Sequence, residues 1–499
     1  MAMVCMVNST AIGILEEDAL LQTNSSVFNG TGSDGRVLSA CPLTPFVRHE
    51  YEGEFVWDTG RQGMLFSALY WGSFTCLLGR MADRYSPRHM LLAMVLLNVV
   101  CSVLTPVATW YGGYVAMFVI RLLMGLGQGL QKPTVTAFAA RWFPVDERST
   151  AISIYTAGNQ MANIIGMPLN AWLCHLRSLW GGWPLIFITS GAVGLVWCII
   201  WHFYVTNRPG THRGISDGER DYITLTLQSQ NLRKEGARTV PWKKLLCSMP
   251  VIACCICSFV NGLVVSTTSS YIPTYFMEVL HLDLYSNGFY SALPYVTQWM
   301  AKFCFAWLAD HLIQTGHLSP TMSTKVFNTV GSLTTAAFLI SCSFLTCAHT
   351  SLAITFLCFS MASFAAYAPG YWTSMVSIAP VFSGTVSALT TTTNQIGSII
   401  APYLVGLITV HGTRAEWQII FGILASALIL SGLFYAIFGS AEIQEWAKEQ
   451  SPSRPTNQVR STSPVPPLDT NGVRPTSSQA NSHYEEESVK DPSITSRSY

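Results

Sequence analysis

The sequence predicts an all-α polytopic membrane protein, and three observations support this fold class. Half of the 499 residues are hydrophobic and only 11% are charged, whereas soluble proteins carry about 25% charged residues. Mean hydropathy is positive, at +0.34. Apolar segments long enough to cross about 30 Å of hydrocarbon recur along the chain. We place these segments at residues 62–80, 89–108, 112–135, 149–171, 183–205, 249–275, 286–307, 326–347, 350–373, 384–410 and 417–440.

The region before the first full span, residues 1–61, is predicted to lie outside the cytoplasm. Residues 1–7 are apolar but too short to span a bilayer, and they lack the basic start of a signal peptide. We interpret them as the end of a first helix whose beginning is absent from the sequence. The polar loop that follows carries three Asn-x-Ser/Thr glycosylation acceptors, and the chain has no others, which favours a lumenal or extracellular loop. The acceptors are Asn8, Asn24 and Asn29.

Basic residues mark the opposite, cytoplasmic side of the membrane. Arg80, Arg84 and Arg88 follow the first full span, and the long loop between the fifth and sixth spans is also rich in Lys and Arg. That loop divides the spans into two groups, and the Ser-, Pro- and Thr-rich end of the chain predicts a disordered cytoplasmic tail. The divisions are an N-terminal bundle at 62–205, a central loop at 206–248, a C-terminal bundle at 249–440 and a tail at 441–499.

The most informative span contains a cation, Arg121, within an otherwise apolar run. Since a helix turns by about 100° per residue, Arg121, Gly125, Gln128 and Lys132 form one stripe. A cation inside a bilayer costs at least about 2.5 kcal/mol and is tolerated where it faces a watery cavity or a partner. Glycines in the same run allow another backbone to approach closely. We predict a cavity that holds an anion against Arg121; the alternative is that Arg121 snorkels or pairs with a backbone carbonyl for packing alone.

Further polar side chains in the predicted spans are candidates for the same cavity. Amides and hydroxyls match a polyol or a carboxylate substrate, and Lys302 is another intramembrane cation. For each residue taken singly, the alternative is a hydrogen bond between helices, which contributes only about 0.6 kcal/mol. Taken together they favour a polar cavity. The candidate substrate-binding residues, with Arg121 and Gln128, are Asn159, Asn163, Asn261, Tyr290, Tyr295 and Asn394.

Composition and motifs exclude several classes of function. A net charge of +1 and the lack of a basic run argue against a nucleic-acid partner. The 14 cysteines show no metal-ligand spacing, so neither a metal site nor a cofactor is expected. Cys41 and Cys174 both fall on the predicted outer side, where they could form a disulfide. A phosphate-binding Gly-rich loop is absent, which argues against direct ATP drive, and the spans hold no catalytic constellation typical of an enzyme.

A short motif resembles the major facilitator superfamily. GRMADRYSPRH, residues 79–89, is similar to that family's loop between its second and third helices, and AWLADHL at 306–312 is a weaker echo in the second half. The resemblance implies two six-helix halves and a cytoplasmic clasp of charged side chains that holds the outward-open state shut on the inside. Ser86-Pro87 departs from the usual glycine turn. The alternative is ordinary positive-inside loop charge. The implied clasp residues are Asp83, Arg84, Arg88, Glu147, Arg148 and Asp310.

Longer stretches resemble the anion:cation symporters, the family that includes sialin and the vesicular glutamate and type I phosphate carriers. RWFPVDERS, SYIPTYFMEVL and NGFYSALPY are among them. The resemblance implies that Arg121 binds the substrate's carboxylate or phosphate group. Proton-coupled members carry Glu where this sequence has Met124 and Gln128, neither of which titrates near neutral pH. Glutamate carriers have a second Arg where this sequence has Asn261.

The sequence therefore predicts a secondary transporter for a small organic or inorganic anion, working by alternating access in a lipid bilayer. A sialic-acid-like acidic sugar, another carboxylate or phosphate would fit. The coupling ion is left open between Na⁺ and H⁺, and membrane potential or exchange would also serve. The membrane is the plasma membrane or a lysosomal or vesicular one. The alternative is a membrane receptor or scaffold that keeps the fold without transporting.

Overall fold

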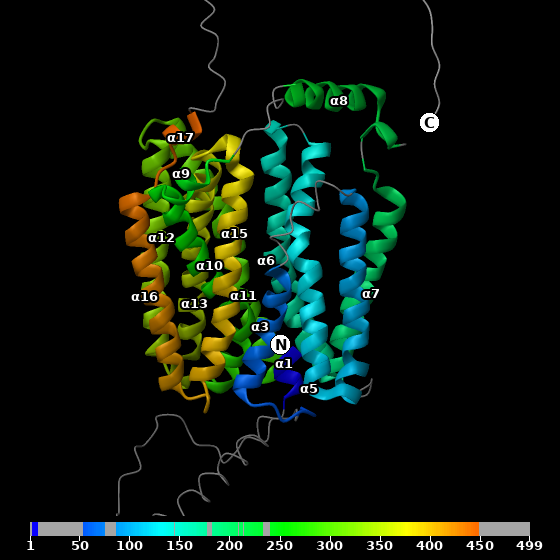
Figure 1. Ribbon diagram of the computed structural model, residues 1–499. Coiled ribbons are helices and arrows are strands. Elements are labelled where there is room, and N and C mark those ends of the chain that lie inside the picture. Colours follow the sequence, from blue (N-terminus) through cyan, green and yellow to red (C-terminus); the bar gives the residue numbers. More distant parts are fainter. Residues whose placement is uncertain are drawn as a thin grey trace, which may run out of the picture. The chain divides into compact units, whose positions relative to one another are not determined.

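Helices make up nearly all of the described chain (Figure 1). Among the described residues the one pairing of extended backbone is an isolated bridge between Val7 and Phe55. The prediction of an all-α protein is confirmed. The structure is a computed structural model, which describes residues 2–7, 53–74, 86–143, 145–176, 182–207, 209–212, 214–232 and 240–448.

The N-terminal half contains one long helix, α5, that holds two predicted spans in a single element. The two spans separate at Gly113, whose φ of 57° and ψ of −142° are not helical. Glycine adopts such a conformation readily because it has no Cβ, and the break falls beside the predicted gap between residues 108 and 112. The described helices of this half are α1 (Ala2–Met6), α3 (Thr59–Ser73), α5 (Pro87–Trp142), α6 (Val145–His175) and α7 (Trp183–Tyr204).

The central region, predicted as a loop, contains helices of its own. Figure 1 shows α8 lying across the end of the bundle opposite α1. We call the end that carries α1 the outer end and the end that carries α8 the inner end, following the orientation predicted from the loop charges. The central elements are η2 (Pro209–Thr211), α8 (Asp217–Leu232) and α9 (Trp242–Leu246).

The C-terminal half repeats a bundle of long helices, one of which is interrupted. Between α13 and α14 the chain passes through a 3₁₀ turn, η4, and a π-helical turn, η5, and Gly370 within η5 has non-helical φ and ψ. The elements are α10 (Met249–Glu278), α11 (Leu284–Gln314), α12 (Pro320–Ser343), η3 (Cys347–His349), α13 (Thr350–Phe364), η4 (Ala365–Tyr367), η5 (Ala368–Trp372), α14 (Thr373–Ser377), η6 (Pro380–Phe382), α15 (Ser383–Ile408), α16 (Arg414–Phe438) and α17 (Glu445–Lys448).

Side-chain caps fix the starts of three helices in this half. The first N–H groups of a helix lack intrahelical acceptors, and a short polar side chain supplies one. Asp283 accepts a hydrogen bond from the Ser286 amide at 3.1 Å ahead of α11, and Ser319 accepts one from Met322 at 3.2 Å ahead of α12. Thr413 and Glu416 form a capping box at α16. Each cap sets where a connecting loop ends and a helix begins.

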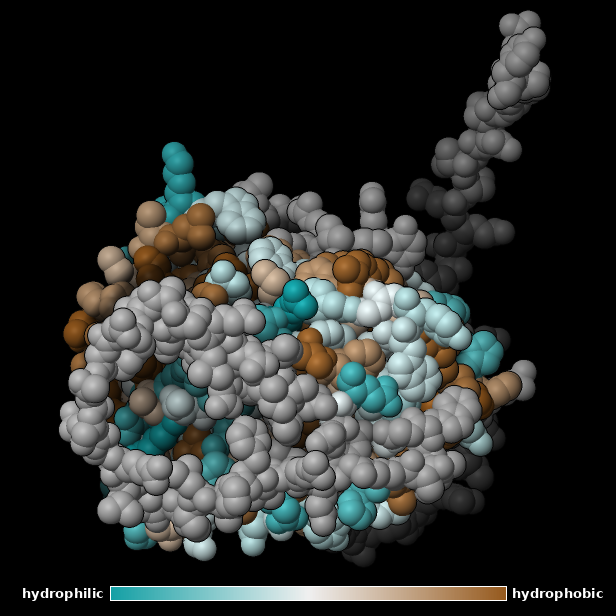
Figure 2. Space-filling model, turned by 90° about the horizontal axis from the view of Figure 1, so that it is seen from below, coloured by the Kyte–Doolittle hydropathy of each residue, from teal (hydrophilic) through white to brown (hydrophobic). Residues whose placement is uncertain are grey.

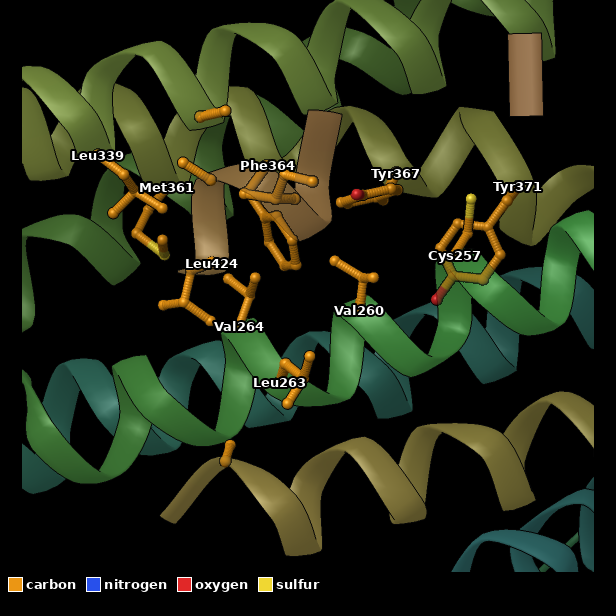
Figure 3. Packing of buried hydrophobic residues seen from close by; sticks show 14 of the residues in the cluster. Cys257, Val260, Leu263, Val264, Leu339, Met361, Phe364, Tyr367, Tyr371 and Leu424 are labelled. Atoms are coloured by element: carbon orange, nitrogen blue, oxygen red, sulfur yellow. The ribbon is translucent and has the colours of Figure 1, made fainter. Parts of the chain in front are cut away.

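The main hydrophobic core lies inside the C-terminal half, around α10. Figure 3 shows Val260 and Val264 of α10 facing Phe364 and Met361 of α13. The interrupted helix is fitted to its neighbour at Gly370, because a Cβ there would lie 2.9 Å from the Cβ of Asn328. Close packing of this kind fixes the break in one position, so the C-terminal half holds α10 rigidly beside the interface with the other half.

Large hydrophobic side chains remain exposed on the helices, as a lipid-facing surface requires. Val193, Val196 and Leu430 are among those that are more than half exposed. Six helical segments in the described residues are long and apolar enough to cross a membrane by length and composition. At the outer end, hydrophilic and hydrophobic residues are intermixed (Figure 2). These observations agree with a polytopic protein whose polar residues concentrate away from the lipid.

Two sequence predictions need correction. Cys174 is bonded to Cys5 and not to Cys41, with 6.3 Å between the two Cα atoms. Cys5 lies in the apolar start of the chain, which packs against α6 and α7 and so brings its thiol to Cys174. The first part of the predicted tail is also folded. Residues Glu445–Lys448 form α17, and Trp446 is buried against Phe382 with 6.0 Å between the ring centroids.

The disulfide gives a direct test of the arrangement at the outer end. Replacing Cys5 by Ser should release the Cys174 thiol and raise the number of thiols that react with maleimide-polyethylene glycol in denatured, unreduced protein by one. Cys198, which is buried and unbonded, is the matched control, since Cys198→Ser should lower the count by one. A count that falls with Cys5→Ser would show that Cys5 is not bonded to Cys174.

Candidate functional site

The candidate site lies where the two halves meet, and two helix pairs form that interface. The first pair is α3 of the N-terminal half with α15 of the C-terminal half. The Thr59 hydroxyl donates to the Gly406 carbonyl at 3.3 Å, and two turns further in, the Ser67 hydroxyl donates to Ile399 at 2.9 Å. Between them, a Cβ on Gly63 would lie 2.5 Å from the Pro402 carbonyl oxygen. The outer ends of α3 and α15 are therefore packed backbone to backbone.

The second pair is α6 with α11, and it is closed in the same way at its outer end. A Cβ on Gly288 would lie 2.3 Å from the Cβ of Ala171 and 3.2 Å from the Met167 carbonyl oxygen. Further along the two helices, the Lys302 ammonium donates to the Thr156 hydroxyl at 3.5 Å. Glycine permits this approach because it has no side chain. Both interface pairs thus meet most closely toward the outer end.

A polar cavity of about 460 Å³ lies inward of the first pair. Its volume is in the range of about 300–1,000 Å³ that is typical of small-molecule sites. Among the described residues, the lining contains four amide side chains and no charged group. An amide both donates and accepts hydrogen bonds, so these walls can bind hydroxyl groups and oxyanions alike. The lining residues come from α3, both parts of α5, and α15: Tyr70, Ser73, Val95, Asn98, Gln128, Gln131 and Gln395.

Arg121 lies on the second part of α5, on the same helix face as Gln128. The two residues are seven positions apart, or about 10 Å along the axis, and Arg121 itself does not line the cavity. Its guanidinium carbon lies 5.4 Å from the centroid of the Phe187 ring on α7. Among the described residues, no carboxylate lies within 4.0 Å of it. The ring face attracts the cation without neutralising it.

The glycines around Arg121 let neighbouring helix segments approach closely, as the sequence predicts. A Cβ on Gly125 would lie 1.9 Å from the Leu69 carbonyl oxygen of α3, and a Cβ on Gly127 would lie 2.5 Å from the Asn98 amide nitrogen in the first part of α5. Both glycines therefore allow the Arg121 segment to pack directly against its neighbours. This packing places the cation beside the helix that forms the interface with α15.

The predicted amides of α6 and of the C-terminal half have different surroundings. On α6, the Asn163 amide donates to the Asn159 carbonyl at 3.1 Å, one turn earlier, and the Asn159 side chain is exposed. Asn394 of α15 donates to the Asn261 side-chain oxygen at 3.1 Å. It also donates to the Ser258 carbonyl at 3.0 Å. Asn261 and Asn394 therefore join α10 to α15, and Asn261 is buried between them.

The two predicted tyrosines of α11 also differ. Tyr290 is 39% exposed, whereas Tyr295 is 5% exposed. The Tyr295 hydroxyl is buried and has no hydrogen-bond partner among the described residues. A buried hydroxyl without a close partner has hydrogen-bonding capacity that a water molecule or a ligand can use. Tyr295 is thus the stronger candidate of the pair.

The predicted cytoplasmic clasp is described only in part. Asp83 and Arg84 lie outside the described residues, as do the side chains of Glu147 and Arg148 at the start of α6. Arg88 donates to the His202 carbonyl at 2.6 Å and so joins α5 to the end of α7. Asp310 is exposed on α11 and makes no ion pair with a described residue. The glycosylation acceptors Asn8, Asn24 and Asn29 also lie outside the described chain.

Of the seven described cavity residues, only Gln128 is among the candidates from the sequence, and the other six are not. Asn98 and Gln131 are lone amides in apolar runs, and that rarity is a signal that could have identified them. Gln395 ends the polar run that includes Asn394, and only the structure separates their roles. The sequence alone does not distinguish Tyr70 as a cavity residue from a Tyr that anchors a helix at the membrane interface.

Comparison with known proteins identifies the family. The family model described as Major Facilitator Superfamily matches residues 25–402 of this chain. The chain belongs to the major facilitator superfamily. It is 34% identical over 463 residues to the uncharacterised transporter slc-17.3 of Caenorhabditis elegans, covering 90% of this chain and 85% of that protein. It is 30% identical over 425 residues to human sialin, covering 84% of each.

Further relatives place this superfamily member among the sialin-like anion:cation symporters. It is 28% identical over 400 residues to sodium-dependent phosphate transport protein 1 of Oryctolagus cuniculus, covering 80% of this chain and 84% of that protein. The solved structure of the Escherichia coli xylose transporter XylE, in a partially occluded inward-open conformation, shares the fold with a TM-score of 0.60. That match is 15% identical and covers 76% of this chain and 87% of the other. Two of these relatives are named as transport proteins, and none is named as an enzyme. This member of the superfamily is a membrane transport protein.

The tight outer interface leads to a test by substitution. Gly63→Ala should force the outer ends of α3 and α15 apart, because the added methyl group meets the Pro402 carbonyl oxygen. A cysteine at position 67, introduced as Ser67→Cys, should then react faster with a membrane-impermeant maleimide added from outside. The matched control is Gly166→Ala on α6, where a Cβ would meet nothing within 4 Å. Equal labelling in the two backgrounds would argue against a closed outer end.

Proposed function

We propose that this protein is a secondary active transporter of a small oxyanion, with Arg121 as the residue that binds the anion's carboxylate or phosphate group. The observation that carries the proposal is the guanidinium in a span with no described carboxylate within 4.0 Å. Such a charge is costly in a bilayer, and a solute that supplies the negative charge offsets that cost. An Arg fork matches carboxylate and phosphate oxygens in a bidentate manner.

The amide-lined cavity supports a substrate with hydroxyl groups or several oxygens. Gln128, Gln131 and Gln395 can bind such groups without adding charge to the pathway. Relatives bear the names sialin and sodium-dependent phosphate transport protein 1, which agrees with an acidic sugar, another carboxylate or phosphate as the transported anion. Tyr295, with its unpartnered hydroxyl, is proposed to contribute from the C-terminal half.

Transport by this fold is proposed to follow alternating access, with the two halves rocking around the interface. The close contacts of Gly63 and Gly288 hold the outer end together, so the described conformation gives access from the inner end. Opening the outer end requires those backbone contacts to separate. The alternative hypothesis, a receptor or scaffold that keeps the fold without transporting, is weaker because no specific observation favours it.

Substitution of Arg121 tests the proposal directly. In proteoliposomes that contain the full chain, Arg121→Ala should reduce saturable uptake of radiolabelled N-acetylneuraminate, glucuronate or phosphate by about 30-fold or more, because a buried charge partner contributes at least about 2 kcal/mol. Arg121→Lys should retain uptake at a reduced rate, since a Lys keeps the charge but not the bidentate geometry. Arg61→Ala is the matched control, because Arg61 is exposed and paired with Asp58 at 3.3 Å. Uptake that is unchanged in Arg121→Ala would contradict the assignment.

The driving force gives a second test. The family resemblance implies that proton-coupled members carry Glu at the positions of Met124 and Gln128. Neither Met nor Gln takes up a proton near neutral pH. We therefore expect uptake to continue when nigericin dissipates the pH gradient, and to respond to a Na⁺ gradient, to a K⁺ diffusion potential set with valinomycin, or to internal anion. Uptake that requires the pH gradient and survives collapse of the voltage would refute this expectation.

A further inference from the structure

Lys302 is a second intramembrane cation, and the proposed function does not use it. It lies on α11 twelve residues before the helix ends at Gln314, or about 18 Å along the axis. Lys302 lies five residues from the inner end of the predicted span at residue 307, or about 7.5 Å along the axis. Its ammonium contacts the Thr156 hydroxyl and the Trp372 ring, which keeps it at the contact between the two halves.

The contacts of Lys302 leave most of its hydrogen-bonding capacity unused. Its ammonium donates to the Thr156 hydroxyl at 3.5 Å, the outer limit of a hydrogen bond. It also lies 5.8 Å from the centroid of the Trp372 ring. A Lys ammonium has three donors, and within the described chain no carboxylate lies within 4.0 Å of it. The half-buried charge is attracted by an aromatic face but is not neutralised.

Lys302 and Arg121 lie at different depths. Arg121 is eight residues from the Gly113 break at the outer end of its span, or about 12 Å. Lys302 is 18 residues from Leu284, where α11 begins at the outer end, or about 27 Å. Counted from these helix starts, the two positions differ by about 15 Å along the helix axes. Their side chains also contact different elements, Phe187 of α7 for Arg121 and Thr156 of α6 for Lys302, so we treat them as two separate sites.

We propose that Lys302 forms a second binding site for small oxyanions, closer to the inner end, which receives the carboxylate or phosphate group after it leaves Arg121. This inference rests on the proposed function for its place in the transport cycle. Trp372 on the interrupted helix holds the ammonium in position, and the two remaining donors bind the anion. Thr156 belongs to the other half, so an anion that draws Lys302 away from Thr156 loosens α6 from α11 on that side.

Equilibrium binding tests the second site independently of transport. The full chain is purified in detergent, and binding of [³²P]phosphate and [¹⁴C]glucuronate is measured with wild type, Arg121→Ala, and the double variant Arg121→Ala with Lys302→Met. The single variant should keep a weak saturable site for at least one probe. The double variant should weaken that remaining binding by about tenfold or more, and Arg121→Ala with Lys302→Arg should preserve it. Complete loss of saturable binding in Arg121→Ala alone would overturn the inference.

A matched control separates a local site from a general change in charge. Lys325 on α12 donates to the Ile437 carbonyl at 3.2 Å, away from the contact between α6 and α11. Arg121→Ala with Lys325→Met removes one cation from the same half and should bind the probes as Arg121→Ala does. If Lys325→Met weakens binding as much as Lys302→Met, the effect is one of overall charge and the Lys302 site is refuted.

Flux distinguishes failure of this inference from failure of the proposed function. In proteoliposomes, Lys302→Met alone should raise the KM for the anion on the inner side by about tenfold and leave the KM on the outer side unchanged. Arg121-dependent uptake with an unchanged inner KM in Lys302→Met overturns the second site and leaves the proposed function standing. Binding to both sites without flux overturns the proposed function and leaves the second site standing.

Discussion

The central constraint on this protein is a guanidinium in a low-dielectric environment with no carboxylate of the described residues within 4.0 Å. A charge at the middle of a span costs at least about 2.5 kcal/mol on insertion scales, and the structure offsets that cost only in part, through the Phe187 ring at 5.4 Å. The rest of the local architecture follows from the need to keep Arg121 away from lipid. Gly125 packs its segment against α3, and α3 in turn forms the interface with α15. A permanent acidic partner would satisfy the charge but would also remove the reason for a solute to bind.

The interface between the halves combines close backbone packing with polar side chains. Toward the outer end, Gly63 and Gly288 let helices of opposite halves touch without intervening side chains. Inward of that contact, the walls are amides, which hydrogen-bond to a solute and carry no charge. Backbone contacts through glycine are short-range and bury little apolar area. They can therefore separate as a unit when the halves rock, whereas the large apolar core of each half keeps its own helices together.

Apolar length was sufficient to predict an all-α polytopic protein, because each span must satisfy its own backbone and be long enough to cross the bilayer. The major facilitator fold was implied by the motif resemblance. Even the break at Gly113 falls beside a predicted gap. The site was less predictable, because helical periodicity places a residue on a face without saying which neighbour covers that face. Asn261 and Asn394 form a hydrogen bond to each other across two helices, a pairing that spacing along one helix cannot reveal. Gln395, the next residue, lines the cavity. The predicted partner of Cys174 was wrong for the same reason, since spacing along the chain does not show that the short N-terminal helix packs against α6.

In the proposed pathway, two cations at different depths would let one route bind an anion and still release it. A single deep charge would hold the anion tightly at one point, and a pathway must bind its solute weakly enough at each point to let it leave. At an effective dielectric constant of about 20, unit charges about 15 Å apart interact by only about 1 kcal/mol. Arg121 and Lys302 therefore attract an anion almost independently of each other. The cavity amides of α5 and α15 carry no charge, so they do not add a further strong binding point to the pathway. Because Lys302 contacts Thr156 of the opposite half, the arrival of the anion at the inner cation is also the event that changes a contact between the halves. In this arrangement the charge of the solute itself couples binding to the movement that releases it.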